Sequence, residues 1–133
     1  MCIRDSNRTI DRAEAAVALA GPVGRLGDGS SVGAAELVVN ATSVGMGQHD
    51  AQGDVPCPIE LIGPHHTVAD LVMHPLRTPL LRGAEARGAA TIDGLGMLVH
   101  QAAHQQRLWT ATDPDPTTMR AAAEAALAAR SDR

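Results

Sequence analysis

The chain has 133 residues and a formal net charge of −4, and with 44% hydrophobic and 20% charged residues it has the balance of one soluble globular domain. All eleven basic residues are arginine and both Tyr and Phe are absent, which excludes lysine chemistry and a tyrosine general acid. A single tryptophan in an acidic chain cannot form the basic, aromatic platform that binds single-stranded nucleic acid. Two isolated cysteines and the lack of a long apolar run predict a cytoplasmic protein that contacts no membrane.

The first predicted element is a helix that follows a short leader. Residues 1–6 match neither a strand nor a helix cap, and we expect a non-native leader there, followed by one domain over residues 7–133. Thr9 can cap a helix, and apolar residues at helical spacing predict that this helix continues to Gly21–Pro22. Residues 24–33 contain four glycines together with Asp and Ser, which predicts a loop.

Short apolar runs alternate with helical patterns through the rest of the chain. The predicted strands are residues 36–40, 67–72 and 89–92. The first of them is predicted to be buried on both faces of the sheet. The predicted helices run from Thr78–Pro79 to Gly88, from near Gly94, and over residues 117–130. This alternation predicts an α/β fold with a parallel sheet, whose ligands bind outside the carboxyl ends of the strands. The junctions that would form such a cleft are residues 7–12, 40–45, 70–75 and 93–97.

The junction at residues 7–12 carries two arginines at the start of a predicted helix. In dinucleotide-binding folds an acidic residue at the end of the second strand binds the ribose 2′-OH of NAD, whereas an arginine there accommodates the 2′-phosphate of NADP. No acid ends the strand here, and Arg8 and Arg12 are spaced to lie on one side of the helix, where the Thr9 hydroxyl and the first amides add donors. The motif predicts an anion site, with a solvated pair of surface arginines as the alternative.

Two further junctions have side chains that suit a nucleotide. Thr42 and Ser43 directly follow a predicted strand, and their small hydroxyl side chains let a dinucleotide pass close to the sheet, although an ordinary turn explains them equally well. Gly94, Met97 and Gln101 fall at offsets 0, 3 and 7 along one edge of a helix. A glycine admits a ring, a methionine gives it an apolar floor and a glutamine offers both a donor and an acceptor. Core packing for Met97 and a solvated amide for Gln101 are the alternatives.

Metal and hydrolase sites are weaker interpretations. His100 and His104 are four residues apart, but Gln101 stands where a zinc-binding helix has its acid, so we expect no metal. The pair His65–His66 has no predicted partner. Ser43 lacks the nucleophile elbow of the hydrolases, so a catalytic triad is not expected.

Four motifs in chain order resemble one family. They are N-R-T-x-x-R-A from residue 7, N-A-T-S-V-G-M from residue 40, A-D-L-V-x-x-P-x-x-T-P-L-L from residue 69 and D-G-L-G-M-L-V-x-Q-A-A from residue 93. Together they resemble the cofactor-binding half of shikimate dehydrogenases over residues 7–127. The resemblance implies a cytoplasmic, NADP-dependent oxidoreductase that reduces 3-dehydroshikimate to shikimate on the pathway to chorismate and the aromatic amino acids. At full length it implies a monomer or a homodimer.

The resemblance also implies a role for each matching position. The implied cofactor-binding residues are Asn7, Arg8, Thr9, Arg12, Thr42, Ser43, Leu71, Gly94 and Met97. The first four would hold the adenosine 2′-phosphate and the next two would border the dinucleotide. The main chain of Leu71 and Gly94 would meet the nicotinamide, with Met97 packed near it. Gln101 would hydrogen-bond a hydroxyl of the substrate, and the resemblance implies no catalytic residue in this chain.

The sequence departs from the family pattern in two respects. Where the family usually has a substrate-binding Tyr, this chain has Met73, whose thioether cannot donate that hydrogen bond, so the choice of substrate is open. The family's first domain, with its catalytic Lys and Asp, and the first strand with its glycine-rich loop are also missing. We therefore expect a partial Rossmann-type, three-layer parallel sheet with a hole between two half-sheets and unpaired strand edges, and no activity from the chain alone.

Two alternatives to this interpretation stay open. One is a stand-alone nucleotide-binding module that has no catalytic domain. The other is a relative that uses quinate, or both quinate and shikimate.

Overall fold

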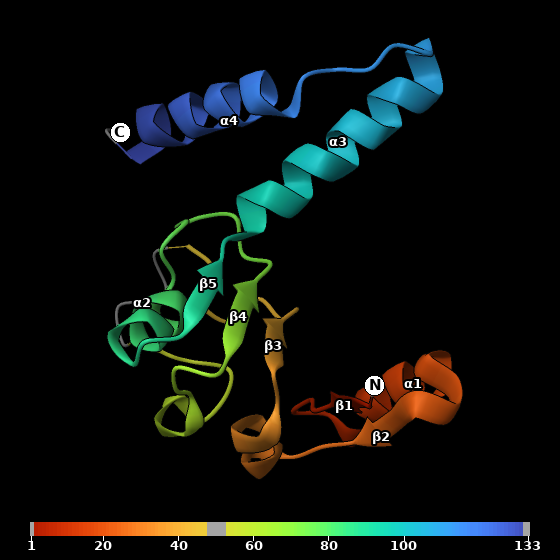
Figure 1. Cartoon of the computed structure of the whole chain (residues 1–133), viewed down its shortest axis with the longest axis vertical. Coiled ribbons are helices and arrows are strands. Elements are labelled where there is room, and N and C mark those ends of the chain that lie inside the picture. The colour runs from red at the N-terminus through yellow and green to blue at the C-terminus, as the bar shows by residue number, and fades with distance from the viewer. Residues whose placement is uncertain (1, 48–52, 132–133) are drawn as a thin grey trace.

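The computed structural model describes residues 2–47 and 53–131 of the chain. Its first part is a small α/β unit (Figure 1), made of β1 (Ile3–Asp5), α1 (Ile10–Ala20) and β2 (Gly24–Leu26). The two strands pair in parallel, with α1 as the crossover between them. Ala13 of α1 is buried, and the helix ends at Gly21, whose φ of 62° favours glycine.

The second part is a three-stranded parallel sheet. Its elements are β3 (Leu37–Asn40), the 3₁₀ turn η4 (Ile59–Leu61), β4 (Thr67–Asp70), α2 (Pro79–Ala86) and β5 (Ala90–Ile92). The strands lie side by side in the order β3-β4-β5, and the register places Asn40 opposite Asp70. Helix α2 begins as predicted, because the Thr78 hydroxyl accepts a hydrogen bond from the Leu81 amide and Pro79 occupies the first helical position.

The hydrophobic core lies between α2, β4 and the segment that leads into β4. Its buried members are Ile62, Val68, Leu80, Leu81, Ala84 and Ala89. Each large aliphatic side chain among them contributes about 1.5–3 kcal/mol through burial. Gly83 lets α2 approach η4 closely, since a Cβ at this position would lie 2.8 Å from Cγ1 of Ile59. The core is small and contains no Phe, Tyr or Trp.

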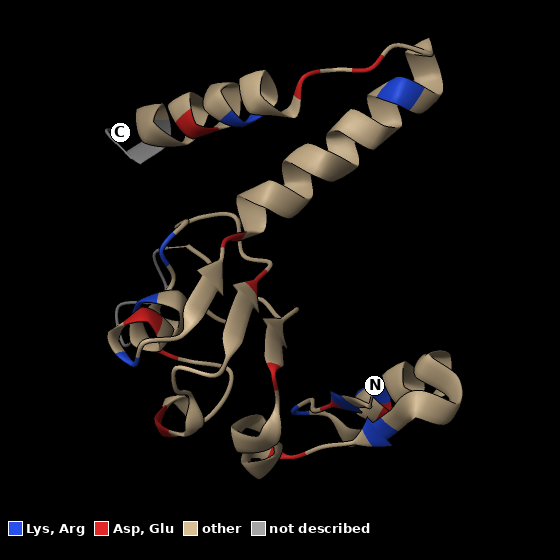
Figure 2. Cartoon of the chain, in the orientation of Figure 1, with Lys and Arg blue, Asp and Glu red and all other residues tan. Residues whose placement is uncertain are grey.

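Two long helices follow the sheet, α3 (Gly94–Thr110) and α4 (Pro116–Ser131). Helix α3 leads away from β5 and α4 returns beside it (Figure 1). Arg107 is the one charged residue of α3, whose ribbon is otherwise uncharged along its length (Figure 2). Leu108 and Trp109, near its end, are 70% and 79% exposed. Within the described ranges, no helix has the length and hydropathy needed to cross a membrane.

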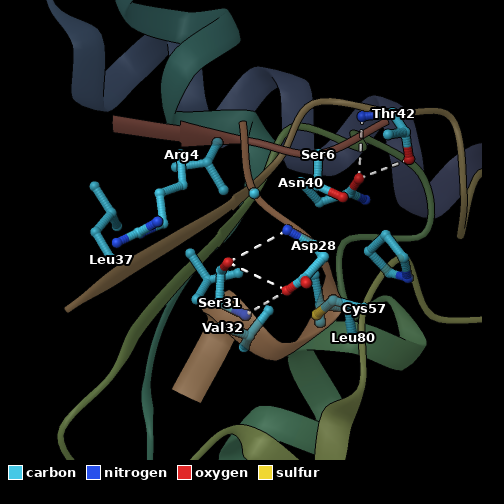
Figure 3. A pocket seen from close by; sticks show the side chains of 14 residues that line it. Arg4, Ser6, Asp28, Ser31, Val32, Leu37, Asn40, Thr42, Cys57 and Leu80 are labelled. Carbon is cyan, nitrogen blue, oxygen red and sulfur yellow. Dashed lines mark hydrogen bonds between the residues drawn. The ribbon is translucent and has the colours of Figure 1, made fainter. Parts of the chain in front are cut away.

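The two sheets are separate. Because β1 pairs with β2 and β3 with β4, one edge of β1 and one edge of β3 have no partner strand within the described part of the chain. A cavity of about 160 Å³ lies between them, lined by Arg4 and Ser6 from the segment of β1 and by Leu37 and Asn40 from β3 (Figure 3). The prediction of an α/β fold whose parallel strands form two half-sheets with a hole between them is confirmed.

Some local predictions are wrong. Residues 1–6 contain β1, and the predicted loop at 24–33 contains β2 and most of the 3₁₀ turn η2 (Gly29–Ala34). These three-residue strands are too short for a hydrophobic pattern, and mutual pairing forms them. The strand predicted at 36–40 is not buried on both faces, because Leu37 and Val39 beside the cavity are 55% and 50% exposed. A non-native origin of residues 1–6 stays a prediction.

Candidate cofactor site

A buried hydrogen-bond network joins the carboxyl ends of β3 and β4 to the start of α2. Asp70 is 1% exposed. Its Oδ1 accepts hydrogen bonds from Asn40 Nδ2 at 2.9 Å and from the Val72 amide at 3.0 Å, and its Oδ2 accepts from the Thr78 hydroxyl at 2.7 Å. One carboxylate thus fixes two strand ends and a helix start, which gives the edge of the sheet a rigid frame.

The same network shapes the turn after β3. Oδ1 of Asn40 accepts from the Thr42 amide at 3.0 Å and from the Thr42 hydroxyl at 2.7 Å, and that hydroxyl accepts from the Val44 amide. The Thr42 hydroxyl hydrogen is therefore already donated within the turn. The Ser43 side chain is exposed and has no hydrogen-bond partner among the described residues. Of the two predicted hydroxyl donors, the geometry leaves Ser43 available to a ligand.

The start of α1 presents donors to solvent at the carboxyl end of β1. Thr9 is the N-cap residue, as predicted, but its side chain makes no capping hydrogen bond, and its amide donates to Asn7 Oδ1 at 3.0 Å. Arg8 and Arg12 are exposed, and neither guanidinium group has an ion-pair or hydrogen-bond partner within the described ranges, although the Arg12 amide donates to the Thr9 carbonyl at 3.1 Å. One acid, Asp11, lies in the same turn. Figure 2 shows basic residues gathered in this N-terminal unit. Two unpaired guanidinium groups next to free helix amides can bind a phosphate.

Gly94 begins α3 in direct contact with the segment that follows β4. A Cβ on Gly94 would lie 2.6 Å from the Val72 carbonyl oxygen and 2.7 Å from the carbonyl carbon of Leu71, so no other residue fits without backbone movement. Asp93 caps the helix, and its Oδ1 accepts from the Leu95 amide at 3.1 Å and the Gly96 amide at 3.2 Å. The structure therefore brings together Leu71 and Gly94, the two predicted main-chain contacts of the nicotinamide.

The remaining predicted residues lie on the outer side of this junction. Met97 is 48% exposed and Gln101 is exposed, so both are open to a ligand, and neither is part of the core. Met73 is 36% exposed and, with His74, lines a second cavity of about 350 Å³. The other residues around this cavity are Met46, Leu95, Leu98, Ala123, Ala126 and Leu127. Apart from His74 the lining is apolar, so the Met73 side chain itself supplies no group that replaces the hydroxyl of a tyrosine.

The histidines form no metal site in the part of the chain that the structure describes. His100 and His104 are exposed on α3. His66 is buried, and its Nδ1 accepts from the Gly63 amide at 3.0 Å while its Nε2 donates to the Val32 carbonyl at 2.9 Å. His65 Nε2 lies 3.3 Å from the Gly33 carbonyl. The pair that had no predicted partner therefore anchors η2 to the turn before β4.

The sequence analysis predicted the four junctions, with Asn40 and Asp70 among their residues, but not the hydrogen bonds and the ion pair that hold the junctions in place. Asn40 and Thr78 both hydrogen-bond to Asp70, because parallel strand ends meet at one edge of the sheet. The polar residues that end two apolar strands were the available signal. The ion pair between Asp93 Oδ2 and Arg120 Nη2, at 2.7 Å, joins residues 27 apart in sequence, and no local pattern could show it.

These features define a class of protein. Parallel strands with helical crossovers, a polar edge at their carboxyl ends, and a helix that starts on a glycine packed against a neighbouring strand end are typical of Rossmann-type nucleotide-binding folds. Residues 94–124 match the family model described as the shikimate 5′-dehydrogenase C-terminal domain. In sequence and in fold, the chain corresponds to the C-terminal part of the shikimate dehydrogenases.

The similarity extends over most of this chain but over less than half of its relatives. An NADP(+) shikimate dehydrogenase from Rhodopseudomonas palustris (strain BisB18) is 46% identical over 128 residues, which are 92% of this chain and 45% of that protein. Another from Thermococcus kodakarensis is 48% identical over 89 residues, 67% of this chain and 31% of the relative. This chain therefore spans less than half the length of either relative.

Solved structures show the same relation. The crystal structure of shikimate 5-dehydrogenase from Thermus thermophilus, in complex with NADP(H) and shikimate, matches with a TM-score of 0.82 and 40% identity. The match covers 91% of this chain and 44% of that one. Quinate dehydrogenase from Corynebacterium glutamicum in complex with NAD matches with a TM-score of 0.79 and 31% identity, over 90% of this chain and 44% of that one. Both half-sheets therefore have counterparts in larger dehydrogenases.

Proposed function

We propose that this chain is the cofactor-binding part of an NADP-dependent shikimate dehydrogenase, which reduces 3-dehydroshikimate to shikimate. The nicotinamide, when bound, supplies the hydride. The residues of this chain bind and orient the cofactor. The resemblance implies that a lysine takes part in proton transfer, and this chain contains no lysine.

The observation that carries this proposal is the pair of unpaired arginines at the start of α1. Arg8 and Arg12 have no carboxylate partner among the described residues, although the chain as a whole is acidic. An exposed arginine pair beside free helix amides provides charge and directed hydrogen bonds for the phosphate that distinguishes NADP from NAD. Asn7 and Thr9 belong to the same proposed phosphate site, where the Thr9 hydroxyl is not used in capping and can donate to the phosphate.

The nicotinamide end of the cofactor belongs at the other sheet in this proposal. Leu71 and Gly94 present main-chain groups there, Ser43 offers a hydroxyl, and Met97 provides an apolar surface. Gln101 lies further along the same edge of α3 and would hydrogen-bond a hydroxyl of the substrate. A cofactor bound in this way spans both half-sheets.

The gap between the half-sheets supports a larger protein. Residues of the longer relatives would complete the sheet between β1 and β3, and the uncharged, exposed face of α3 would be covered by further chain. We place that whole protein in the cytoplasm, as a monomer or homodimer, on the pathway to chorismate and the aromatic amino acids.

A quinate-using enzyme is the second candidate, because Met73 stands where the resemblance implies a substrate-binding Tyr and therefore leaves the choice of substrate open. The cavity that Met73 lines is apolar apart from His74, and one of the similar structures is a quinate dehydrogenase. Comparing kcat/KM for quinate and shikimate in the complete protein decides between the two. A ratio above one would favour quinate.

Substitution of Arg8 tests the cofactor assignment. We expect Arg8→Ala to weaken NADP binding about tenfold or more and to change NAD binding less than about twofold, because a charge-assisted hydrogen bond to phosphate is lost. Isothermal titration calorimetry of the 133-residue chain with each cofactor measures this.

Arg87→Ala is the matched control for this substitution, since Arg87 is equally exposed but lies after α2, away from the site. Equal losses in Arg8→Ala and Arg87→Ala would show that net charge alone matters. Equal losses for NAD and NADP would remove the 2′-phosphate assignment.

A further inference from the structure

Helix α4 covers a cavity and is only lightly packed. Ala123, Ala126 and Leu127 form its side of the 350 Å³ cavity, and Leu95 and Leu98 of α3 lie across from them. None of the described side chains of α4 is fully buried. A helix that rests over open space gains little from apolar burial, so its position depends on a few specific contacts.

One ion pair fastens α4 to the rest of the molecule. Nη2 of Arg120 lies 2.7 Å from Oδ2 of Asp93, and Nη1 lies 3.3 Å from Oδ1, which makes a bidentate pair. Among the ion pairs of the described residues this is the one that joins α4 to another element, because Arg120–Glu124 lies within α4 and Arg107–Asp113 joins α3 to the linker.

The carboxylate that receives Arg120 also organises the start of α3. Asp93 accepts the Leu95 and Gly96 amides, and the next residue, Gly94, is wedged against the main chain of Leu71 and Val72. The Arg120 hydrogen bond holds the pKa of Asp93 below its usual value, an effect that the two amides reinforce and partial burial opposes. Asp93 is therefore kept ionised at the point where α4, α3 and the end of β4 meet.

We propose that Arg120 is a positioning residue for the cofactor site. Through its ion pair with Asp93, it couples the placement of α4 over the cavity to the placement of Gly94 beside Leu71. The role of Leu71 and Gly94 in binding nicotinamide rests on the proposed function, whereas the coupling itself does not. Release of Arg120 would free α4 and loosen the first turn of α3 together.

Amide hydrogen exchange of the 133-residue chain tests the coupling without a cofactor. In Arg120→Gln we expect the amides of residues 121–127, and those of Leu95 and Gly96, to exchange about fivefold faster. This factor corresponds to the stabilisation expected from one partly exposed, bidentate ion pair. Amides of α2 and β4 should keep their protection, which shows that the variant is folded. Arg120→Lys should restore part of the protection, because an ammonium makes one of the two contacts.

Arg107→Gln is the matched control, since Arg107 pairs with Asp113 at the exposed linker, with Nε 3.3 Å from Oδ1. It should leave residues 121–127, Leu95 and Gly96 unchanged. Unchanged exchange in Arg120→Gln would overturn the proposal. Equal acceleration in Arg107→Gln would also overturn it.

The pH dependence gives an independent readout. Because the folded pKa of Asp93 is lowered, the contribution of this pair is present above the usual aspartate pKa and is lost as pH falls through the lowered value. In Arg120→Gln the titration of the Asp93 carboxyl, followed by carbon NMR, should move to higher pH, and in Arg107→Gln it should not.

Calorimetry with NADP then separates the two proposals. An unsubstituted chain that does not bind NADP counts against the proposed function alone, and equal NADP affinity in Arg120→Gln counts against a positioning role of Arg120 for the cofactor site.

Discussion

Replacement of Asp70 by alanine should destabilise the fold by about 3–5 kcal/mol, because each buried donor left without an acceptor costs about 1–3 kcal/mol. Three donors, on Asn40, Val72 and Thr78, would lose their acceptor in a site that is 1% exposed. Small domains have about 5–15 kcal/mol of stability in total, and the core here is modest. We therefore expect much of the variant to be unfolded at 37 °C. Urea unfolding followed by circular dichroism measures the loss.

Two variants separate the network from the charge. Asp54→Ala removes an exposed carboxylate and should change the free energy of unfolding by less than about 0.5 kcal/mol. Asp70→Asn keeps the shape and should cost less than Asp70→Ala, because the amide oxygen still accepts from Asn40 and Val72. A loss in Asp70→Ala as small as that in Asp54→Ala would show that the network does not hold the strand ends.

The purified 133-residue chain should show no shikimate-dependent formation of NADPH. Without lysine it has no candidate for the proton-transfer lysine that the family resemblance implies, and general acid–base catalysis alone contributes about 10²–10⁴-fold to a rate. The expected rate is therefore at least about 10⁴-fold below that of a complete enzyme, since substrate positioning is lost as well. The ultraviolet absorbance of NADPH follows the reaction.

The complete shikimate 5-dehydrogenase from Thermus thermophilus provides the positive control, assayed under the same conditions. The match with this chain covers 44% of that protein. Turnover by the short chain within about a hundredfold of the control would contradict the proposal that catalysis needs residues outside it.

Much of the fold followed from the sequence where local patterns were strong. The α2 start at Thr78–Pro79 was predicted because capping and proline geometry act within a few residues. A start of α3 near Gly94 was predicted as well. β1 and β2 were missed because three-residue strands carry no periodicity. The burial of β3 was overestimated, since the sequence shows that a run is apolar but not that its neighbour is missing.

The site could be predicted to the level of junctions. Gly94 was identified by position, and the close main-chain contact with Leu71 gives the physical reason for a glycine. The use of the Thr42 hydroxyl inside its own turn could not be foreseen, because it depends on the orientation of Asn40. Contacts such as Arg120 with Asp93 depend on how separate helices pack, and they require the structure.

The hydrogen bond between His66 and η2 lies in the connector between the two half-sheets. The arginines proposed for one end of the cofactor and the glycine proposed for the other end belong to different half-sheets, which are joined by a connector that includes η2. His66 holds this connector through the Val32 carbonyl, and so helps to determine how far apart the two ends of the binding surface stand. A substitution of this histidine would remove the hydrogen bond to the Val32 carbonyl and loosen the connector, although His66 is not among the predicted cofactor-binding residues.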